Sequence, residues 1–437
     1  MSLMRNYKIA IVGAGPAGYY AAQALQNSQN EEISISIDMF EKLPTPWGLV
    51  RSGVAPDHPK IKSVAKVFDK IASEDKFRLF ANVQLGKDID LDELKANYDA
   101  VVIAIGSSVG KKLGIPGEEL IGSISSSEFV PWYNGHPDFA DLEVPLDSQT
   151  AVVIGAGNVA MDVARSLGLD PAEFEKTDMA TYAISALQKS KIRDVHICAR
   201  RAPEHAAFTA PEIRELPHFE KTSIVIDPNH ISSALKRTES LGDQAKDINT
   251  ILTAMLAIAE EEKPKQERSI NFHFLLTPIE IKGEKRVEEV VFKVNEVIDG
   301  KVVATDQTIS IKCGLVITAI GYNTPVIDGL EIEDGKVKNI NGRVANGVYV
   351  VGWAKRGPSG VIGTNKSDST EVMQTLIADL SEAKNSSDFE AVLKQRGIKY
   401  VNQQDWGKIN DAEVAAGEQL GKPRLKITSR EEMLNLL

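Results

Sequence analysis

The most constraining feature of this sequence is a glycine-rich turn that occurs twice, each time between a short apolar run and a helical pattern. The first copy follows KIAIVG (8–13) and precedes YYAAQALQ, and it reads Gly13-Ala14-Gly15-Pro16-Ala17-Gly18. A turn with G-x-G-x-x-G spacing between a strand and a helix is typical of dinucleotide binding. Gly13 makes the tight turn, Gly15 leaves room for a pyrophosphate, and Gly18 lets the helix pack closely on the strand.

An acidic residue follows the first turn at the expected distance. The strand pattern ISISIDMFEK (33–42) contains Glu41 near its end, 23 residues after Gly18. A carboxylate about 20 residues after such a turn typically accepts hydrogen bonds from a ribose. The N-terminus of the intervening helix offers free N–H groups and partial positive charge to phosphates. The sequence therefore predicts a dinucleotide site in which Glu41 meets the ribose.

The second copy lies in the middle of the chain. TAVVI (150–154) is followed by Gly155-Ala156-Gly157-Asn158-Val159-Ala160 and then by the helical pattern MDVARSLG. An alanine in place of the third glycine is tolerated in this motif. Both copies keep the strand before and the helix after, which favours two dinucleotide sites over one site and a vestigial copy.

Two arginines stand at the tip of the next strand pattern, DVHICAR (194–200), where an NAD-binding unit would place a carboxylate. The planar guanidinium groups of Arg200 and Arg201 suit a phosphate, and the adenosine 2′-phosphate distinguishes NADPH from NADH. We therefore predict that this pair selects NADPH; the alternative is a solvated pair that caps a strand. A flavin dinucleotide in the first unit and a nicotinamide dinucleotide in the second is the natural interpretation, although spacing alone does not require it.

The 437 residues exceed what one ordinary hydrophobic core accommodates, so at least two domains are expected. VVIAIG (101–106) and LVITAIGYN (315–323) are near-identical strand patterns on either side of the second dinucleotide unit. We expect an α/β fold with two Rossmann-like three-layer dinucleotide-binding domains. The FAD domain comprises 1–107 and 323–437, and the NADP domain, 108–322, is inserted in it.

Three further segments are expected to support these domains. Residues 270–313 alternate like the strands of a β-meander, and residues 229–263 have a polar helical pattern. Residues 380–437 are charged and helical, and we expect them to form a covering element.

Composition excludes several classes of protein. The net charge of −11 argues against a nucleic-acid binder, and no apolar run reaches the about 18 residues of a membrane span. The opening MSLMRNYKIAIVG lacks the features of a signal peptide, so we expect a cytoplasmic protein or an already trimmed form. Cys198 and Cys313 form no C-x-x-C, and the histidines show no ligand spacing, so neither a dithiol relay nor a metal site is expected.

Four longer stretches complete the pattern: LVRSGVAPDHPKIK (49–62), GNVAMDVAR (157–165), RRAPEHAAFTAPEIREL (200–216) and VYVVGWAKRGPSGVIGTN (348–365). Together they resemble the adrenodoxin-reductase-like ferredoxin–NADP reductases, which are two-domain FAD oxidoreductases with a glutathione-reductase-type architecture. The resemblance covers almost the whole chain. The sequence departs from the family pattern at Ala202, where a glycine is frequent, and at His205, where a glutamine is frequent.

The resemblance implies roles for individual residues. The implied FAD contacts, besides the glycines of the first turn, are Ala17, Glu41, Leu49, Val83, Trp353, Gly360, Val361 and Ile362. The turn Ala156-Gly157-Asn158-Val159 is expected to meet the NADP pyrophosphate, with Arg200 and Arg201 on the 2′-phosphate. Glu212 and Gly360 are expected near the nicotinamide, and His58 near the redox centre.

The residues themselves support some of these roles better than others. Trp353 can supply a flat apolar wall beside a flavin or nicotinamide ring, and the glycines around Gly360 allow the backbone to approach a planar ring. Lys355 and Arg356 either add charge there or are simply solvated. Glu212 is equally well explained as a first-turn helix acid, and His58 as a turn residue.

The expected reaction is hydride transfer from NADPH to FAD, followed by single-electron transfer to a ferredoxin or a flavodoxin. The absence of a C-x-x-C distinguishes this route from that of thioredoxin reductase. Three alternatives stay open: an electron-delivering subunit of a larger enzyme, a diaphorase or quinone reductase, and a nucleotide-sensing protein without turnover. Since both this chain and ferredoxins are acidic, docking needs a local basic patch, for which the candidates are Arg214, Lys221, Lys236 and Arg237.

Overall fold

The computed structural model describes residues 4–384 and 388–437, so residues 1–3 of the predicted FAD domain and 385–387 of the predicted covering element lie outside the described residues. The chain forms two compact units. The first comprises Met1–Val109, Asn134–Pro137 and Tyr322–Leu437, and the second Gly110–Tyr133 and Asp138–Gly321. The first unit ends at Val109 and resumes at Tyr322, which is two residues later and one residue earlier than the boundaries expected from the sequence. The sequence did not indicate that 134–137 returns to the first unit, where Lys426 Nζ donates to the Asn134 carbonyl (3.0 Å).

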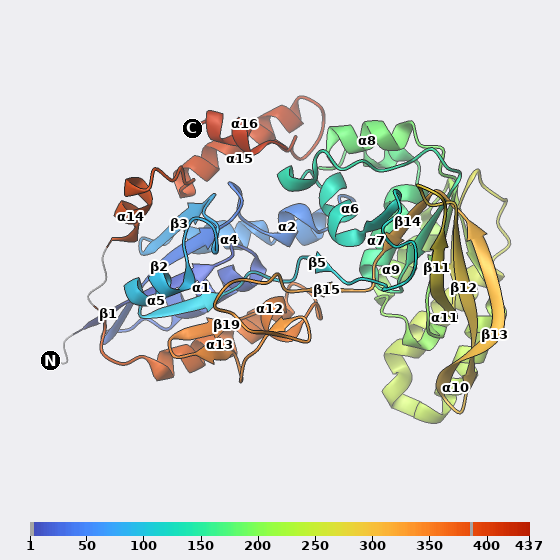
Figure 1. Ribbon diagram of the computed structural model, residues 1–437, viewed down its shortest axis with the longest axis horizontal. Helices are drawn as coiled ribbons and strands as arrows, with labels where there is room; N and C mark the ends of the chain where they lie inside the picture. Colours follow the sequence, from blue (N-terminus) through green and yellow to red (C-terminus); the bar gives the residue numbers. More distant parts are fainter. Residues whose placement is uncertain (1–3, 385–387) are drawn as a thin grey trace. The chain divides into compact units, whose positions relative to one another are not determined.

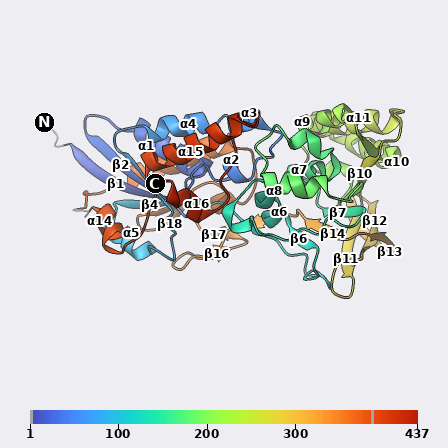
Figure 2. The same ribbon diagram turned by 90° about the horizontal axis from the view of Figure 1, so that it is seen from above.

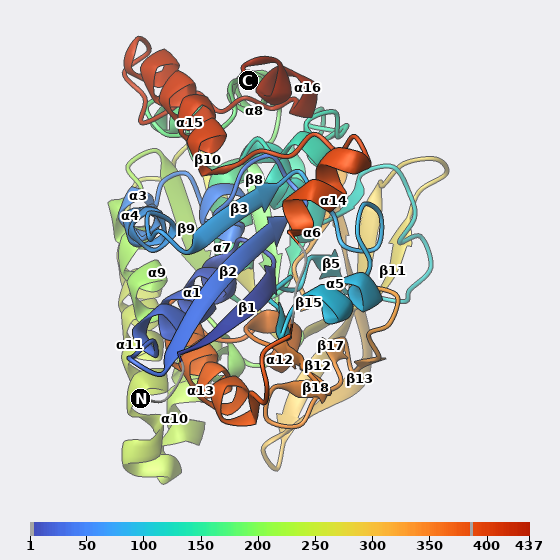
Figure 3. The ribbon, with the colours of Figure 1, turned by 90° about the vertical axis from the view of Figure 1, so that its left-hand side faces the viewer.

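A six-stranded sheet forms the centre of the first unit (Figures 1 and 3). Its order is β18 (Arg343–Ala345), β19 (Val348–Val350), β4 (Ala100–Ile103), β1 (Arg5–Val12), β2 (Ile33–Glu41) and β3 (Phe77–Ala81). All pairs are parallel except β18–β19. Val12 lies opposite both Phe40 and Ile103, so three strands end together at the first glycine turn.

Helices cover both faces of this sheet, because successive residues of the parallel strands are buried on opposite sides. Ile9 and Ile11 face one core and Ala10 and Val12 the other. The first core is covered by α1 (Pro16–Asn27), α4 (Ala65–Ala72), α13 (Thr364–Asp379), α15 (Gln403–Glu418) and α16 (Arg430–Asn435). The second is covered by α5 (Leu91–Asn97) and α14 (Phe389–Gln395). Short elements complete the unit: α2 (Leu49–Ser52), α3 (Pro59–Lys62), α12 (Trp353–Arg356), β16 (Ile332–Glu333) and β17 (Lys336–Val337).

The second unit contains a six-stranded parallel sheet with helices on one face and a second sheet on the other (Figure 2). The strand order is β6 (Ser123–Ser125), β14 (Leu315–Thr318), β7 (Thr150–Ile154), β8 (Asp194–Cys198), β10 (Arg268–His273) and β9 (Thr222–Ile226). The helical side comprises α6 (Ser126–Tyr133), α7 (Asn158–Gly168), α8 (Thr181–Gln188), α9 (Ala210–Glu215), α10 (Pro228–Thr238) and α11 (Lys246–Glu260). The two-residue strands β5 (Val109–Gly110) and β15 (Tyr322–Asn323) lie where the chain passes from one unit to the other.

The opposite face is covered by the antiparallel strands β11 (Leu276–Lys282), β12 (Glu289–Ile298) and β13 (Lys301–Lys312). The expected meander over 270–313 was wrong at its start, because β10 pairs in parallel with β8 and β9 in the main sheet. The alternation of Ile270 and Phe272 with polar residues fits a strand of either sheet, so the pattern could not distinguish them.

The predicted fold class is confirmed: each unit is a three-layer α/β domain with a glycine turn after a central parallel strand. The near-identical patterns seen in the sequence form the same element in each unit. β4 lies beside β1 with Ile103 opposite Val12, and β14 lies beside β7 with Thr318 opposite Ile154. Among the described residues, no helix combines the length and the apolar character that crossing a bilayer requires.

Candidate cofactor sites

The first glycine of each turn is fixed by close packing. Gly13 has φ +109° and Gly155 has φ +149°, a region that side chains rarely adopt. A Cβ on Gly13 would lie 2.4 Å from the Ala104 carbonyl oxygen, and one on Gly155 would lie 2.2 Å from that of Ala319. Both carbonyls belong to residues just after the neighbouring strands β4 and β14, so each sheet imposes the same turn.

The second glycine of each turn could carry a Cβ without a close contact. Gly15 and Gly157 have extended backbones and precede α1 and α7 as the N-cap residues. A Cβ on Gly15 would meet only the Cα of Gly48, at 3.9 Å, and one on Gly157 only the Cβ of Ala207, at 3.8 Å. Glycine is therefore not required here by protein packing, and the free space at a helix N-terminus fits a pyrophosphate group.

Glu41 fixes the first turn from the side. Its carboxylate accepts hydrogen bonds from Ala14 N–H (2.9 Å) and Leu43 N–H (3.0 Å), and the side chain is buried. Burial raises the pKa of Glu41, although these backbone hydrogen bonds act in the opposite direction. Val83 donates its N–H to the Glu41 carbonyl (2.8 Å), and its side chain is packed in the core. The role of Glu41 toward a ribose and the cofactor contact of Val83 stay predictions.

Two residues that sequence reasoning missed, Trp47 and Gly48, lie against the first turn. Trp47 N–H donates to the Ala14 carbonyl (2.8 Å), and a Cβ on Gly48 would lie 2.9 Å from the Cα of Gly15. Leu49 follows at the start of α2 with 42% of its surface exposed. Gly48 has φ +52° and Trp47 φ +83°, so the chain bends sharply there. The dipeptide Trp-Gly was the available signal, but nothing in the sequence places it beside Gly15.

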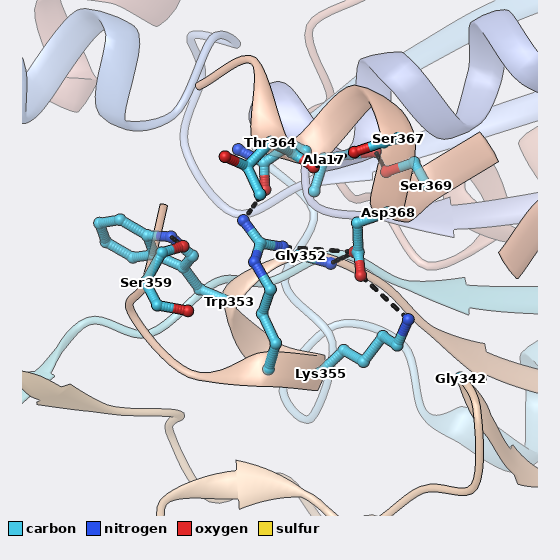
Figure 4. Close-up of polar contacts among 12 residues, drawn as sticks. Ala17, Gly342, Gly352, Trp353, Lys355, Ser359, Thr364, Ser367, Asp368 and Ser369 are labelled. Carbon is cyan, nitrogen blue, oxygen red and sulfur yellow. Dashed lines mark hydrogen bonds and ion pairs between the residues drawn. The ribbon is translucent and has the colours of Figure 1, made fainter. Parts of the chain in front are cut away.

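The GWAKRGPSG stretch is organised by Asp368, another residue that sequence reasoning missed (Figure 4). Asp368 accepts a hydrogen bond from Gly352 N–H (2.6 Å) and one from Lys355 Nζ (2.9 Å), and it lies 3.3 Å from Arg356 Nη1. The two cations are therefore paired with a carboxylate rather than simply solvated. Arg356 Nε and Nη1 are buried without a hydrogen-bond partner among the described residues, which fits a ligand that accepts hydrogen bonds.

This stretch meets the first turn at Ala17. A Cβ on Gly352 would lie 2.5 Å from the Ala17 Cβ, and Ser369 Oγ donates to the Ala17 carbonyl (3.0 Å). Figure 4 shows Ala17 between Gly352 and Ser369. Two motifs far apart in sequence thus form one continuous surface around the N-terminus of α1.

Trp353 and residues 360–362 border the same region. The half-buried Trp353 indole donates to the Ser359 carbonyl (3.2 Å), and its ring lies nearly parallel to that of Tyr322, with centroids 6.4 Å apart. Gly360 has φ +77°, Val361 is 65% exposed, and Ile362 packs partly on the core. The helix α13 begins at Thr364, four residues after Gly360. The flavin contacts of these residues stay predictions.

In the second unit, the loop after the arginines is tied to the glycine turn. Ala207 N–H donates to the Ala156 carbonyl (2.7 Å), and Thr209 N–H donates to Asn158 Oδ1 (2.9 Å). Val159 packs partly against the core. The stretches GNVAMDVAR and RRAPEHAAFTAPEIREL therefore form one surface.

Arg200 and Arg201 lie in the loop after β8, which ends at Cys198, and not at the strand tip as expected. Both side chains are exposed, and Arg201 Nη2 donates to the His205 carbonyl (3.3 Å). The Arg200 guanidinium makes no hydrogen bond or ion pair within the part of the chain that the structure describes. Ala202 is buried with φ −69°, so the alanine at this position causes no backbone strain.

The two predicted catalytic residues have structural partners. The buried carboxylate of Glu212 forms an ion pair with Arg165 Nη1, and Arg165 also pairs with Asp162 (2.5 Å). The half-buried His58 precedes α3, and its carbonyl accepts from Ile61 N–H (3.2 Å). The catalytic roles of Glu212 and His58 stay predictions.

Both cysteines are buried thiols. Burial raises the pKa of Cys198 strongly and that of Cys313 to about 12. Neither is a thiolate at neutral pH, so neither has the reactivity of a redox cysteine.

Comparison with known proteins bears on these sites. Residues 7–209 match the pyridine nucleotide-disulphide oxidoreductase family. The NADPH-ferredoxin reductase FprA of Mycobacterium tuberculosis is 42% identical over 456 residues, which cover 99% of each chain. This chain belongs to the adrenodoxin-reductase-like ferredoxin–NADP reductases. The mitochondrial NADPH:adrenodoxin oxidoreductase of Salvelinus fontinalis is 38% identical, over 98% of this chain and 91% of that protein.

The fold agrees with that membership. A solved structure of Mycobacterium tuberculosis FprA in complex with NADPH superposes with a TM-score of 0.94 at 41% identity, covering 99% of both chains. The resemblance drawn from the four sequence stretches is confirmed.

Proposed function

We propose that this chain is an FAD-dependent ferredoxin–NADP reductase that takes electrons from NADPH and passes them to a ferredoxin or a flavodoxin. The observation that carries the proposal is the repeated glycine turn with an open second position, in a chain that is 42% identical to an NADPH-ferredoxin reductase over 99% of its length. FAD, when bound, supplies the group that accepts a hydride and releases electrons singly.

In the first unit, the proposed FAD residues surround the N-terminus of α1. Gly15 gives the pyrophosphate access to the helix N–H groups, and Glu41 holds the turn and faces the ribose. Trp353 and the exposed Leu49 and Val361 border the flavin end. The remaining residues of the proposed site are Gly13, Ala17, Gly18, Val83, Gly360 and Ile362.

In the second unit, the proposed NADP residues follow β7 and β8. The turn Ala156-Gly157-Asn158-Val159 receives the pyrophosphate, and the unpaired Arg200, with Arg201, binds the 2′-phosphate. We propose Glu212 as a nicotinamide contact and His58 as a proton or positioning group. The ion pair with Arg165 holds the Glu212 carboxylate in place.

Docking of an acidic carrier requires exposed positive charge. Lys221 is paired with Asp170 (2.6 Å) and Arg237 with Glu204 (2.5 Å), so their charges are largely compensated. Arg214 and Lys236 are exposed, which narrows the proposed patch in this unit to these two. A cytoplasmic location is part of the proposal, and cell fractionation tests it.

An anaerobic titration with NADPH and then NADH, followed by visible absorbance, tests the function. We expect a flavin band that NADPH bleaches at far lower concentration than NADH, and reoxidation by a ferredoxin. Equal bleaching by both coenzymes would contradict the role of the arginines. High turnover with quinones but none with ferredoxins would favour a diaphorase. Stable purification with a larger enzyme would favour an electron-delivering subunit. Bound FAD that NADPH cannot reduce would favour a nucleotide sensor.

A further inference from the structure

Helix α15, the last but one in the chain, is joined to the segment beside the first glycine turn by a buried ion pair. Arg51, in α2, donates two hydrogen bonds to Glu413, one from Nη1 (2.7 Å) and one from Nη2 (2.5 Å). The Arg51 side chain is 4% exposed and that of Glu413 is fully buried. A bidentate guanidinium–carboxylate pair fixes orientation as well as distance.

Three further groups complete this network. Glu413 also accepts hydrogen bonds from Arg424 Nη1 (3.1 Å) and from Ile427 N–H (2.9 Å). Lys426 Nζ donates to the Arg51 carbonyl (3.0 Å). Burial opposes the ionised form of Glu413, but the two arginines outweigh it and lower its pKa. The carboxylate is therefore charged, and each of its oxygens accepts hydrogen bonds.

Aromatic contacts tie the same two segments together. The Trp47 ring meets the Trp406 ring of α15 edge to face, with centroids 4.9 Å apart. Arg424 lies over the Trp47 ring at 5.2 Å, and Arg51 lies over the Trp406 ring at 5.6 Å. The two arginines of the ion network thus also hold the two tryptophans, at separations where cation–π attraction is effective.

This concentration of contacts surrounds an unfavourable backbone. Trp47 has φ +83°, which is unfavourable for a bulky residue and persists only when the surroundings enforce it. The enforced conformation brings Gly48 against Gly15 and leaves Leu49 exposed beside the turn. The contacts made by α15 therefore act on the backbone that borders the proposed flavin site.

We propose that Glu413 is a positioning residue for the cofactor site: through Arg51 and the Trp47–Trp406 contact, residues 403–427 hold segment 47–52 in the conformation that receives FAD. The proposal rests on the proposed function for the identity of the ligand. It assigns to the C-terminal helices a role in cofactor binding beyond covering the sheet.

The test compares three variants. Glu413→Gln keeps the shape of the side chain but leaves Arg51 without a full counter-charge. The double variant Arg51→Met with Glu413→Leu replaces the pair by apolar side chains, a change that often preserves stability. Arg78→Met is the matched control, because it breaks another bidentate pair of the same unit, with Asp38 (2.8 Å for both hydrogen bonds), outside segment 47–52.

Three quantities are measured for each: the melting temperature, the FAD dissociation constant by flavin fluorescence, and amide hydrogen exchange of Trp47 and Gly53 in the apoprotein. We expect both Glu413 variants to weaken FAD binding at least tenfold and to speed exchange at these amides at least tenfold. The double variant should do so even at a melting temperature close to that of the wild type. Arg78→Met should lower the melting temperature and leave FAD affinity and exchange in the segment unchanged.

Two results would overturn the inference. One is an FAD dissociation constant that follows the melting temperature in all variants, Arg78→Met included. The other is wild-type FAD affinity and exchange in the double variant. A wild-type protein that binds no FAD would refute the proposed function itself, whereas the exchange measurement on the apoprotein still reports on the role of Glu413.

Discussion

Replacing Gly157 by alanine separates the cofactor role of the second turn from its structural role. Gly157 has φ −131° and ψ 178°, which alanine adopts freely, and the new Cβ would meet only Ala207, at an ordinary 3.8 Å. The same replacement at Gly155 would put a Cβ 2.2 Å from the Ala319 oxygen at φ +149°. The two glycines lie two positions apart, yet only Gly155 is required by the fold.

The expected energies differ accordingly. For Gly157→Ala, the weaker N-cap costs a few tenths to about 1 kcal/mol, and the reduced entropy of the unfolded chain offsets about 0.4–1 kcal/mol. The melting temperature should therefore stay within about 2 °C of the wild type. Gly155→Ala combines backbone strain and overpacking, each of about 1–3 kcal/mol. At Gly157, the methyl group keeps the pyrophosphate from the helix N–H groups, and the loss of charge-assisted hydrogen bonds, about 1.5–3 kcal/mol, weakens NADPH binding roughly 10–100-fold.

The assay is rapid-mixing reduction of the bound flavin over a range of NADPH concentrations, with thermal melts of the same samples. We expect Gly157→Ala to retain FAD and its melting temperature but to need a much higher NADPH concentration for half-maximal rate. Gly155→Ala should lose stability first. Unchanged NADPH affinity in Gly157→Ala would refute the assignment of this turn to the NADP pyrophosphate. Unfolding of the variant would refute the claim that the fold does not require Gly157.

Three further predictions concern charge. Replacing Arg200 and Arg201 by glutamine should lower kcat/KM for NADPH about 10–100-fold, through lost charge-assisted hydrogen bonds, and leave that for NADH nearly unchanged; steady-state kinetics with both coenzymes checks this. Burial lowers the pKa of His273 to about 4, against about 6.5 in the unfolded chain. Its protonation therefore costs no stability above pH about 6.5, and the free energy of unfolding falls by at most about 3.4 kcal/mol as the pH falls through about 4. Thermal melts at several pH values should show a smaller acid loss in His273→Asn. Raising the salt concentration should slow ferredoxin reduction and spare reduction of a small neutral dye, and equal slowing of both would contradict an electrostatic dock.

The sequence alone determined the two turns and the fold around them. Six residues with two or three glycines encode a tight bend, a second position without a side chain and a close helix contact, and this pattern is contiguous in the chain. The structure reproduces this in both units, with positive φ at Gly13 and Gly155 and no close contact for a Cβ at Gly15 and Gly157. The family resemblance was also readable, because its stretches are contiguous in the chain.

Only the tertiary structure decided how distant stretches complete each site. Nothing in the periodicity of the chain indicates that Gly48 lies against Gly15, that Asp368 binds the Gly352 N–H, or that Glu413 holds Arg51. Hydrophobic spacing shows which face of an element is buried, but not which element covers it. Contacts between residues hundreds of positions apart form only when the chain folds. They determine the side-chain positions that local sequence patterns leave undetermined.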